Sequence, residues 1–149
     1  MSSNILDKII SISGKPGLFK LLSQTRNGVI AESIMDKEKT STNSIQHINL
    51  LYKIKVYGSV EEFPLIKIFE KIFQHESGKK TKINPKSDSK FLEAYFLEVF
   101  HDYDRDRVYP SHVKKIIQWY NILLDVGVLK FEDETLTGNN SKNNKNEFT

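Results

Sequence analysis

The chain has 149 residues, with 22 Lys and Arg against 19 Asp and Glu, which gives a formal net charge of +3. Hydrophobic residues make up 38% and aromatic residues 11%, which excludes wholesale disorder and predicts one domain or two small ones in contact. Cysteine is absent, which excludes disulfides, thiol nucleophiles and thiolate metal sites. No apolar run approaches the roughly 20 residues of a membrane span, and charges interrupt the first twenty positions, so we expect a cytoplasmic protein without membrane contact.

The residues from 18 to 57 have the pattern of short strands. Apolar runs at 18–22 and 29–34 flank Arg26-Asn27-Gly28, and Asn-Gly is typical of the primed two-residue turn that closes a hairpin. Around this hairpin we expect, in chain order, a turn at 13–17, a turn at 36–39, a polar strand at 40–45, a short helical turn within 48–54 and a last strand at 55–57.

From Glu61 onward the apolar residues recur with a helical period. Pro64 fits the first position of a helix, where its missing N–H is no loss, and Glu61 and Glu62 fit the positive end of the helix dipole. The apolar faces of three predicted helices are Leu65, Ile66, Phe69, Ile72 and Phe73; Phe91, Leu92, Tyr95, Phe96, Val99 and Phe100; and Val113, Ile116, Ile117, Tyr120, Leu123 and Leu124.

The fold class that follows is α+β. We expect a small antiparallel β-barrel or curled sheet of the SH3 or Sm kind at 1–58, followed by a three-helix domain at 59–136. Residues 128–131 would pack back as a short strand or extension, and the Asn- and Lys-rich tail at 137–149 is expected to be disordered. A β unit of about 40 residues is marginal alone, so we expect the helices to cover part of the sheet and share one interior with it.

The acidic loop between the second and third predicted helices has some of the residues of a metal site. Asp102, Asp104 and Asp106 alternate as they do at the start of an EF-hand calcium loop. The sixth position, however, is Arg107 instead of Gly, and the twelfth is Val113 instead of Glu. The pattern therefore favours Asp–Arg pairing within the loop, and we expect neither a metal nor a cofactor.

No catalytic motif stands out. The stretch from Ser13 to Leu18 lacks the GxxxxGK[ST] spacing of a phosphate loop, and no nucleophile elbow occurs, so we expect no enzyme. Residues 1–58 hold eight Lys and Arg but only four Asp and Glu, which is mildly basic and short of the dense stripe of a committed nucleic-acid binder.

The leading hypothesis is a non-catalytic binding or adaptor protein that contacts a protein partner through the loops at 14–17 and 26–28. The alternative is RNA or DNA binding through the basic face of the β domain, and the third is an enzyme or metal protein centred on 102–106. The candidate contact residues are Lys15, Lys20, Arg26, Asn27, Lys53 and Lys55. The sequence leaves the partner's identity and the oligomeric state open.

Three segments, Ser11–Gly28, Asp102–Tyr109 and Trp119–Asn121, resemble a family of uncharacterised proteins found in Bacteroidota. The resemblance spans roughly residues 5 to 132 and is least close from Met35 to Leu50. It implies a bacterial cytoplasmic protein with a short barrel-like front domain and a helical rear domain. It supplies no activity, cofactor or catalytic residue.

Overall fold

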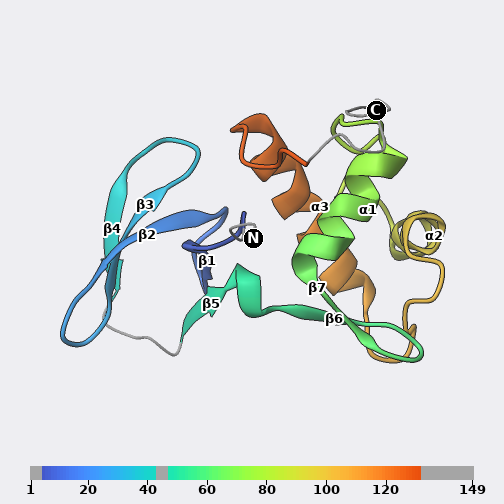
Figure 1. Cartoon of the computed structure of the whole chain (residues 1–149), viewed down its shortest axis with the longest axis horizontal. Coiled ribbons are helices and arrows are strands. Elements are labelled where there is room, and N and C mark those ends of the chain that lie inside the picture. Colours follow the sequence, from blue (N-terminus) through green and yellow to red (C-terminus); the bar gives the residue numbers. More distant parts are fainter. Residues whose placement is uncertain (1–4, 43–46, 132–149) are drawn as a thin grey trace, which may run out of the picture.

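The computed structural model describes residues 5–42 and 47–131, and within these ranges it contains two antiparallel sheets and three α-helices (Figure 1). The elements in chain order are β1 (Ile9–Ile12), β2 (Phe19–Gln24), β3 (Val29–Ser33), β4 (Lys39–Thr42), β5 (Ile48–Leu50), the 3₁₀ turn η2 (Leu51–Lys53), β6 (Lys55–Tyr57), β7 (Glu62–Pro64), α1 (Leu65–His75), α2 (Ser89–Val99) and α3 (Pro110–Asp125). The α+β class is confirmed. Predictions for residues 43–45 and for the tail lie outside the described residues. None of these three helices combines the length and apolar character needed to cross a bilayer.

The larger sheet has the strand order β4-β3-β2-β1-β5, with every neighbouring pair antiparallel. The predicted hairpin is confirmed, because Gln24 pairs with Val29 and Phe19 with Ser33. Sequence analysis assigned no strand to residues 9–12, yet β1 lies between β2 and β5 and is buried throughout. Its β-branched run Ile-Ile-Ser-Ile is typical of a strand covered on both faces.

The turn between β2 and β3 differs from the prediction. Neither Asn27 nor Gly28 has the positive φ that a primed turn requires. Instead, the Thr25 N–H donates to the Gly28 carbonyl oxygen at 2.8 Å, and the Gly28 N–H donates to the Thr25 hydroxyl oxygen at 2.9 Å. The threonine hydroxyl thus accepts from the Gly28 amide and closes the turn without left-handed backbone.

The sheet is curled rather than closed in the described residues, since its edge strands β4 and β5 do not pair with each other. The sheet has a small cluster of buried side chains of its own. That cluster consists of Ile10, Ile12, Phe19, Val29 and Ala31, with Leu21, Ile48 and Leu50 packed against it. Of the two forms expected from the sequence, the structure shows the curled sheet.

Around residue 60 the strand predicted at 55–57 is confirmed, but its pairing and the start of the first helix differ from the prediction. The strand Lys55–Tyr57 exists, but it pairs with β7 in a separate sheet instead of joining the first. Glu62 and Pro64 are extended, so α1 begins at Leu65, Pro64 is its N-cap, and no acidic residue lies in its first turn. The cause is a tight hairpin in which the Gly58 N–H donates to the Glu61 carbonyl oxygen at 2.8 Å.

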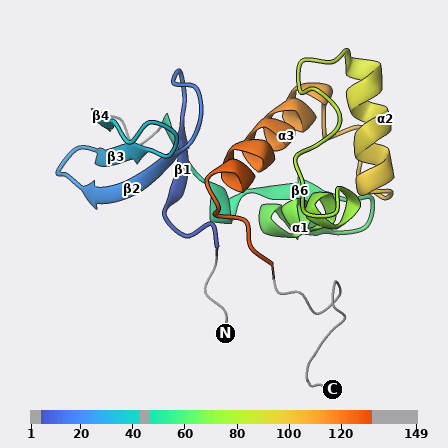
Figure 2. The ribbon, with the colours of Figure 1, turned by 90° about the horizontal axis from the view of Figure 1, so that it is seen from above.

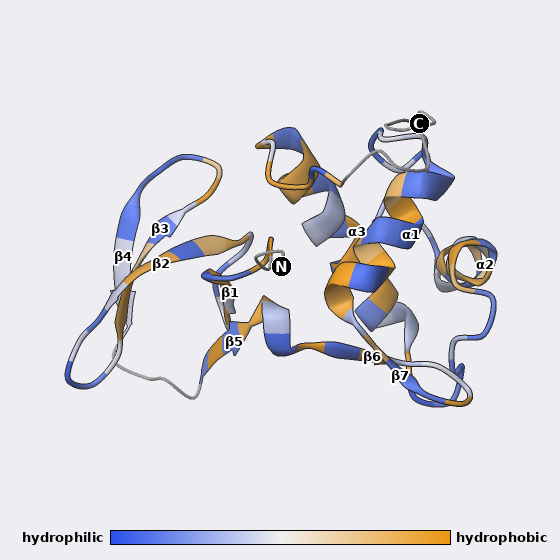
Figure 3. Ribbon diagram, viewed as in Figure 1, coloured by the Kyte–Doolittle hydropathy of each residue, from blue (hydrophilic) through white to orange (hydrophobic). Residues whose placement is uncertain are grey.

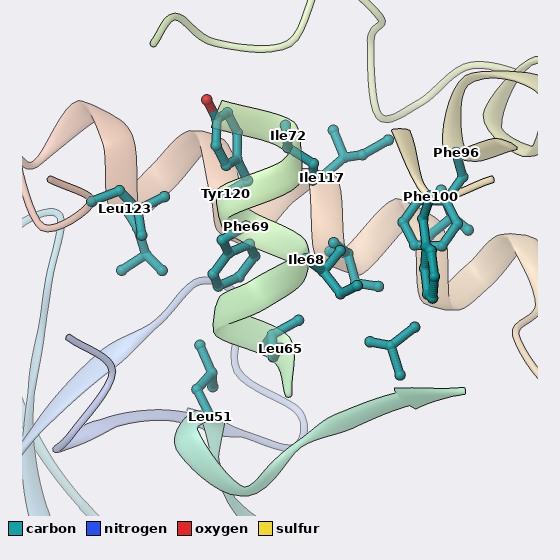
Figure 4. Close-up of a cluster of buried hydrophobic side chains, with 14 of the residues drawn as sticks. Leu51, Leu65, Ile68, Phe69, Ile72, Phe96, Phe100, Ile117, Tyr120 and Leu123 are labelled. Carbon is teal, nitrogen blue, oxygen red and sulfur yellow. The ribbon is translucent and has the colours of Figure 1, made fainter. Parts of the chain in front are cut away.

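The main core lies among the three helices, and Figure 4 shows it around α1. Phe69 of α1 lies 6.3 Å from the ring of Tyr120 of α3, and both side chains are fully buried. The same cluster includes side chains from β1, from the turns and loop beside the strands of the larger sheet and from η2: Leu6, Ile9, Leu18, Ile34 and Leu51. The expected shared interior is therefore present only in part: β1 and the turns and loop beside the strands contribute to the core among the helices, whereas the sheet keeps a separate cluster of its own.

The predicted helix faces need three adjustments. Ile68 of α1 was not assigned to the core but is fully buried, whereas Ile66 and Phe73 are only half-buried. Phe91 was assigned to the buried stripe of α2 and is 53% exposed. Residues 128–131 form an extension without strand pairing, in which Leu129 is buried.

Candidate functional site

The β1–β2 loop and the β3–β4 turn meet at one end of the larger sheet. Gly14 and Gly17 both have positive φ (86° and 82°), a backbone that only glycine adopts freely, and they hold Lys15 exposed between them. The Ile34 N–H donates to the Leu18 carbonyl oxygen at 3.1 Å, which ties the turn to the loop. Met35 follows and is 64% exposed. We call this end of the sheet, with Lys15, Gly17 and Met35, the loop end.

A Cβ atom placed on Gly17 would lie 4.0 Å from the Met35 sulfur, so the two residues are neighbours in space. The β3–β4 turn also contains Lys37 at a φ of 67° and an Asp36 carboxylate that accepts from the Glu38 N–H at 3.0 Å. The loop end therefore offers one flexible apolar side chain beside exposed lysines on a turn with defined backbone geometry.

The loop holding Arg26 and Asn27 lies at the other end of β2. Phe19 pairs with Ser33 near the loop end, while Gln24 pairs with Val29 next to the β2–β3 loop, five residues away along the strand. The structure therefore does not bring the two predicted contact loops together. Figure 3 shows the β2–β3 loop as hydrophilic, whereas the β3–β4 turn mixes apolar and polar residues.

The remaining candidate cations are exposed and dispersed. Lys20 lies on β2, where Glu32 of β3 is its cross-strand partner and Lys39 of β4 pairs with Glu32 in turn. Lys53 lies on η2 with its Nζ 5.9 Å from the centroid of the neighbouring Tyr52 ring, and Lys55 begins β6. Glu32 therefore offsets part of the positive charge on the sheet.

In the acidic loop before α3, side chains contact one another, and one of them contacts β6. Asp104 accepts hydrogen bonds from Arg107 Nε at 2.8 Å and from the Asp106 N–H at 2.9 Å. The Arg107 side chain lowers the pKa of Asp104, which in turn raises the pKa of Arg107. The Arg107 guanidinium lies 4.2 Å from the centroid of the Tyr57 ring. The predicted Asp–Arg pairing is thus what the structure shows, and it positions the loop.

Groups of three or more metal-ligating side chains do not occur in the ranges 5–42 and 47–131. Each of the three aspartates of the loop lies within those ranges, and the backbones of two of them form hydrogen bonds with β6 and with the turn that follows it. The Ser59 N–H donates to the Asp102 carbonyl oxygen at 2.8 Å, and the Asp104 N–H donates to the Tyr57 carbonyl oxygen at 2.9 Å. These two backbone hydrogen bonds account for the position of the loop.

Sequence reasoning missed a buried polar cluster at the C-terminal end of α1. Glu76 is only 5% exposed, and its carboxylate accepts from the Tyr95 hydroxyl and, at 3.3 Å, from the Lys82 N–H. The Tyr120 hydroxyl donates to the Lys79 carbonyl oxygen at 2.8 Å. Burial, and then the hydrogen bond to Glu76, raise the pKa of Tyr95, so its hydroxyl stays protonated as a donor.

The cluster also holds the α1–α2 connection in place through hydrogen bonds from α3. The amide oxygen of Asn121 accepts from the Thr81 N–H at 3.0 Å, and its amide nitrogen donates to the Thr81 hydroxyl at 3.1 Å. A signal for the cluster is present in the sequence, because Glu76 follows Ile72 by four residues and therefore lies on the apolar face of α1. Glu76, Tyr95 and Tyr120 are buried, so the arrangement positions the chain.

Two sequence families match the chain. Residues 6–51 match the family described as Domain of unknown function (DUF5606), and residues 54–123 match that described as Domain of unknown function (DUF6852). A comparison with curated proteins returns no match.

A solved structure is also similar. It is a solution NMR structure of a protein from Bacteroides vulgatus, from the Northeast Structural Genomics Consortium, with 40% sequence identity and a TM-score of 0.74. The match covers 88% of this chain and 94% of that one. The resemblance found from the sequence is thereby confirmed. This chain belongs to the same family as the Bacteroides vulgatus protein, with a β part at the N-terminus and a helical part at the C-terminus.

Proposed function

We propose that the protein is a non-catalytic, cytoplasmic binding module that contacts a protein partner through the loop end of its larger sheet. The observation that carries this proposal is the exposure of Met35, on the β3–β4 turn, beside Gly17 of the β1–β2 loop. An exposed methionine adapts its shape to a partner, and a loop with defined backbone loses little entropy on binding.

The curl of the sheet supports a relationship to small barrels of the SH3 or Sm kind. One of its faces buries Ile10, Phe19 and Ala31, as the inner face of such a barrel would. In this proposal the helices stabilise the sheet through the shared core, while its loops remain available for contact.

The test is affinity purification from the native cell with a tagged full-length chain and two matched variants. Met35→Asp combined with Lys15→Glu alters the loop end, whereas Arg26→Ser combined with Asn27→Ser alters the opposite loop. All three chains must show the same circular dichroism and thermal midpoint. A partner lost only with the loop-end variant supports the proposal. A partner retained by that variant contradicts it.

A second candidate function is RNA or DNA binding through Lys15, Lys20, Arg26, Lys53 and Lys55. The observation that favours it is that all five side chains are exposed. Nucleic-acid binding predicts retention on heparin or RNA that weakens steeply with salt, because bound cations are released from phosphate. No retention at about 50 mM salt would remove this candidate.

A further inference from the structure

A stripe of apolar side chains runs along the outer face of α2. It consists of Phe91, Ala94 and Leu97, which are spaced three residues apart and lie on one side of the helix. Phe91 is 53% exposed, Leu97 is 36% exposed, and Ala94 is exposed as well. Figures 1 and 2 place α2 at the end of the molecule opposite the larger sheet.

Two opposite charges flank this stripe symmetrically. Lys90 precedes Ala94 by four residues, and Glu98 follows it by four. The Lys90 Nζ lies 5.2 Å from the centroid of the Phe91 ring, and the Glu98 side chain is 65% exposed although an oxygen lies 3.5 Å from His75 Nε2. Both charges are therefore accessible beside the apolar side chains.

The dipole of α2 disfavours a lysine at position 90 and a glutamate at position 98. A cation near the N-terminus and an anion near the C-terminus of a helix each oppose the partial charge of that end. Lys90 is the second residue of α2 and Glu98 the last but one. Their order thus opposes the stability of α2 in isolation, and a partner with the reverse order of charges would offset this cost.

We propose that a second copy of this chain docks on the stripe, with the two α2 helices antiparallel about a two-fold axis beside Ala94. Reversing the helix places Phe91 at the level of Leu97 of the second copy. The same operation places Lys90 at the level of Glu98 of the second copy, and symmetry repeats both contacts. The small side chain of Ala94 lets the two helices approach at their midpoint.

The charge order is what selects a second copy over an unrelated protein. An antiparallel copy of α2 presents its charges in the reverse order without any further assumption. The helix has 11 residues and is about 16 Å long, so the contact falls below the roughly 1,200 Å² of a standard stable interface. The expected dimer is therefore weak, and it leaves the loop end of both copies free.

The test is sedimentation equilibrium of the full-length chain between about 10 µM and about 1 mM. The wild type is expected to shift from the mass of one chain toward that of two. Lys90→Glu and Glu98→Lys each place like charges opposite one another, so each variant alone should weaken dimerisation about tenfold or more. Lys114→Glu, an equal charge change on exposed α3 surface, should leave it unchanged.

The decisive sample is an equimolar mixture of the Lys90→Glu and Glu98→Lys chains. Across the two-fold axis one chain then presents two glutamates and the other two lysines, so the mixture should form a dimer that neither chain forms alone. A wild-type chain that stays monomeric at about 1 mM would overturn the proposal. A mixture no more dimeric than its components would also overturn it.

Discussion

The Tyr95 hydroxyl of α2 donates a hydrogen bond to the Glu76 carboxylate at the end of α1, and both groups are buried. The same carboxylate oxygen accepts from the Lys82 N–H in the α1–α2 connection. One side chain on the apolar face of α1 thus orients a neighbouring helix and the segment that leads to it.

Removing the tyrosine hydroxyl should destabilise the protein. Tyr95→Phe leaves the buried Glu76 carboxylate without its hydroxyl donor, so we expect the free energy of unfolding to fall by about 1–3 kcal/mol. Urea denaturation followed by Trp119 fluorescence measures the change. Tyr52→Phe is the control, because Tyr52 is 39% exposed and its contact with Lys53 involves the ring. Equal stability of the Tyr95→Phe and wild-type proteins would show that the bond contributes nothing.

The buried tyrosines also predict how stability depends on pH. Burial and the nearby Glu76 raise the pKa of both Tyr95 and Tyr120 above the ordinary tyrosine value of 10.0. Above about pH 10 the unfolded chain therefore releases protons that the folded chain keeps, so the free energy of unfolding should fall as pH rises. Urea midpoints between about pH 8 and pH 11 measure this slope, which should be shallower in Tyr95→Phe. An unchanged slope in that variant would contradict the assignment.

The hairpin that separates the sheet from α1 depends on Gly58. A Cβ atom at this position would lie 2.7 Å from the Glu61 carbonyl oxygen and 2.9 Å from the Phe63 ring. Gly58→Ala should therefore lower the free energy of unfolding by about 1–3 kcal/mol. Ser59→Ala, at the exposed next residue, should stay within about 0.5 kcal/mol of the wild type. Similar values for the two variants would contradict this close packing.

Removing the Asp104 carboxylate should make the loop before α3 more mobile. Asp104→Ala eliminates the acceptor for Arg107 Nε and the Asp106 N–H. We expect faster hydrogen exchange at the Ser59 amide, which donates to the Asp102 carbonyl oxygen, without faster exchange at the Ile117 amide in α3. Asp125→Ala, at an exposed aspartate on α3, is the matched control. Unchanged exchange at Ser59 would show that backbone contacts alone hold the loop.

Most helices and strands could be predicted from the sequence, because apolar residues recur with different periods in strands and in helices. The alternation in β2 and β3 and the three- and four-residue spacing in α1 and α3 each correspond to a side that the structure buries. The strand β1 was missed because a strand buried on both faces shows no alternation. β7 was missed because Pro64 suits the start of a helix as well as the end of a strand.

Predictions about individual side chains failed where tertiary packing decides. Phe91 has the spacing of the buried stripe, but α2 is a peripheral helix whose contacts use Leu92, Tyr95 and Phe96. Glu76 is a charged residue, and only the fold shows the tyrosine and backbone donors that make its burial tolerable. The six candidate contact residues were placed by residue type, and the structure distributes them over both ends of the sheet, η2 and β6.

Leu6, Ile9, Leu18 and Ile34, which lie in β1 and beside the strands of the larger sheet, join the core among the helices and should couple the folding of the two parts. Urea unfolding followed residue by residue by NMR tests this coupling most directly, with the amide of Ala31 in β3 and the amide of Ile117 in α3 as probes. Because each part supplies core to the other, both probes should report the same midpoint, and Leu18→Ala should lower both together. Two separate midpoints, or a Leu18→Ala effect confined to the sheet, would contradict the account.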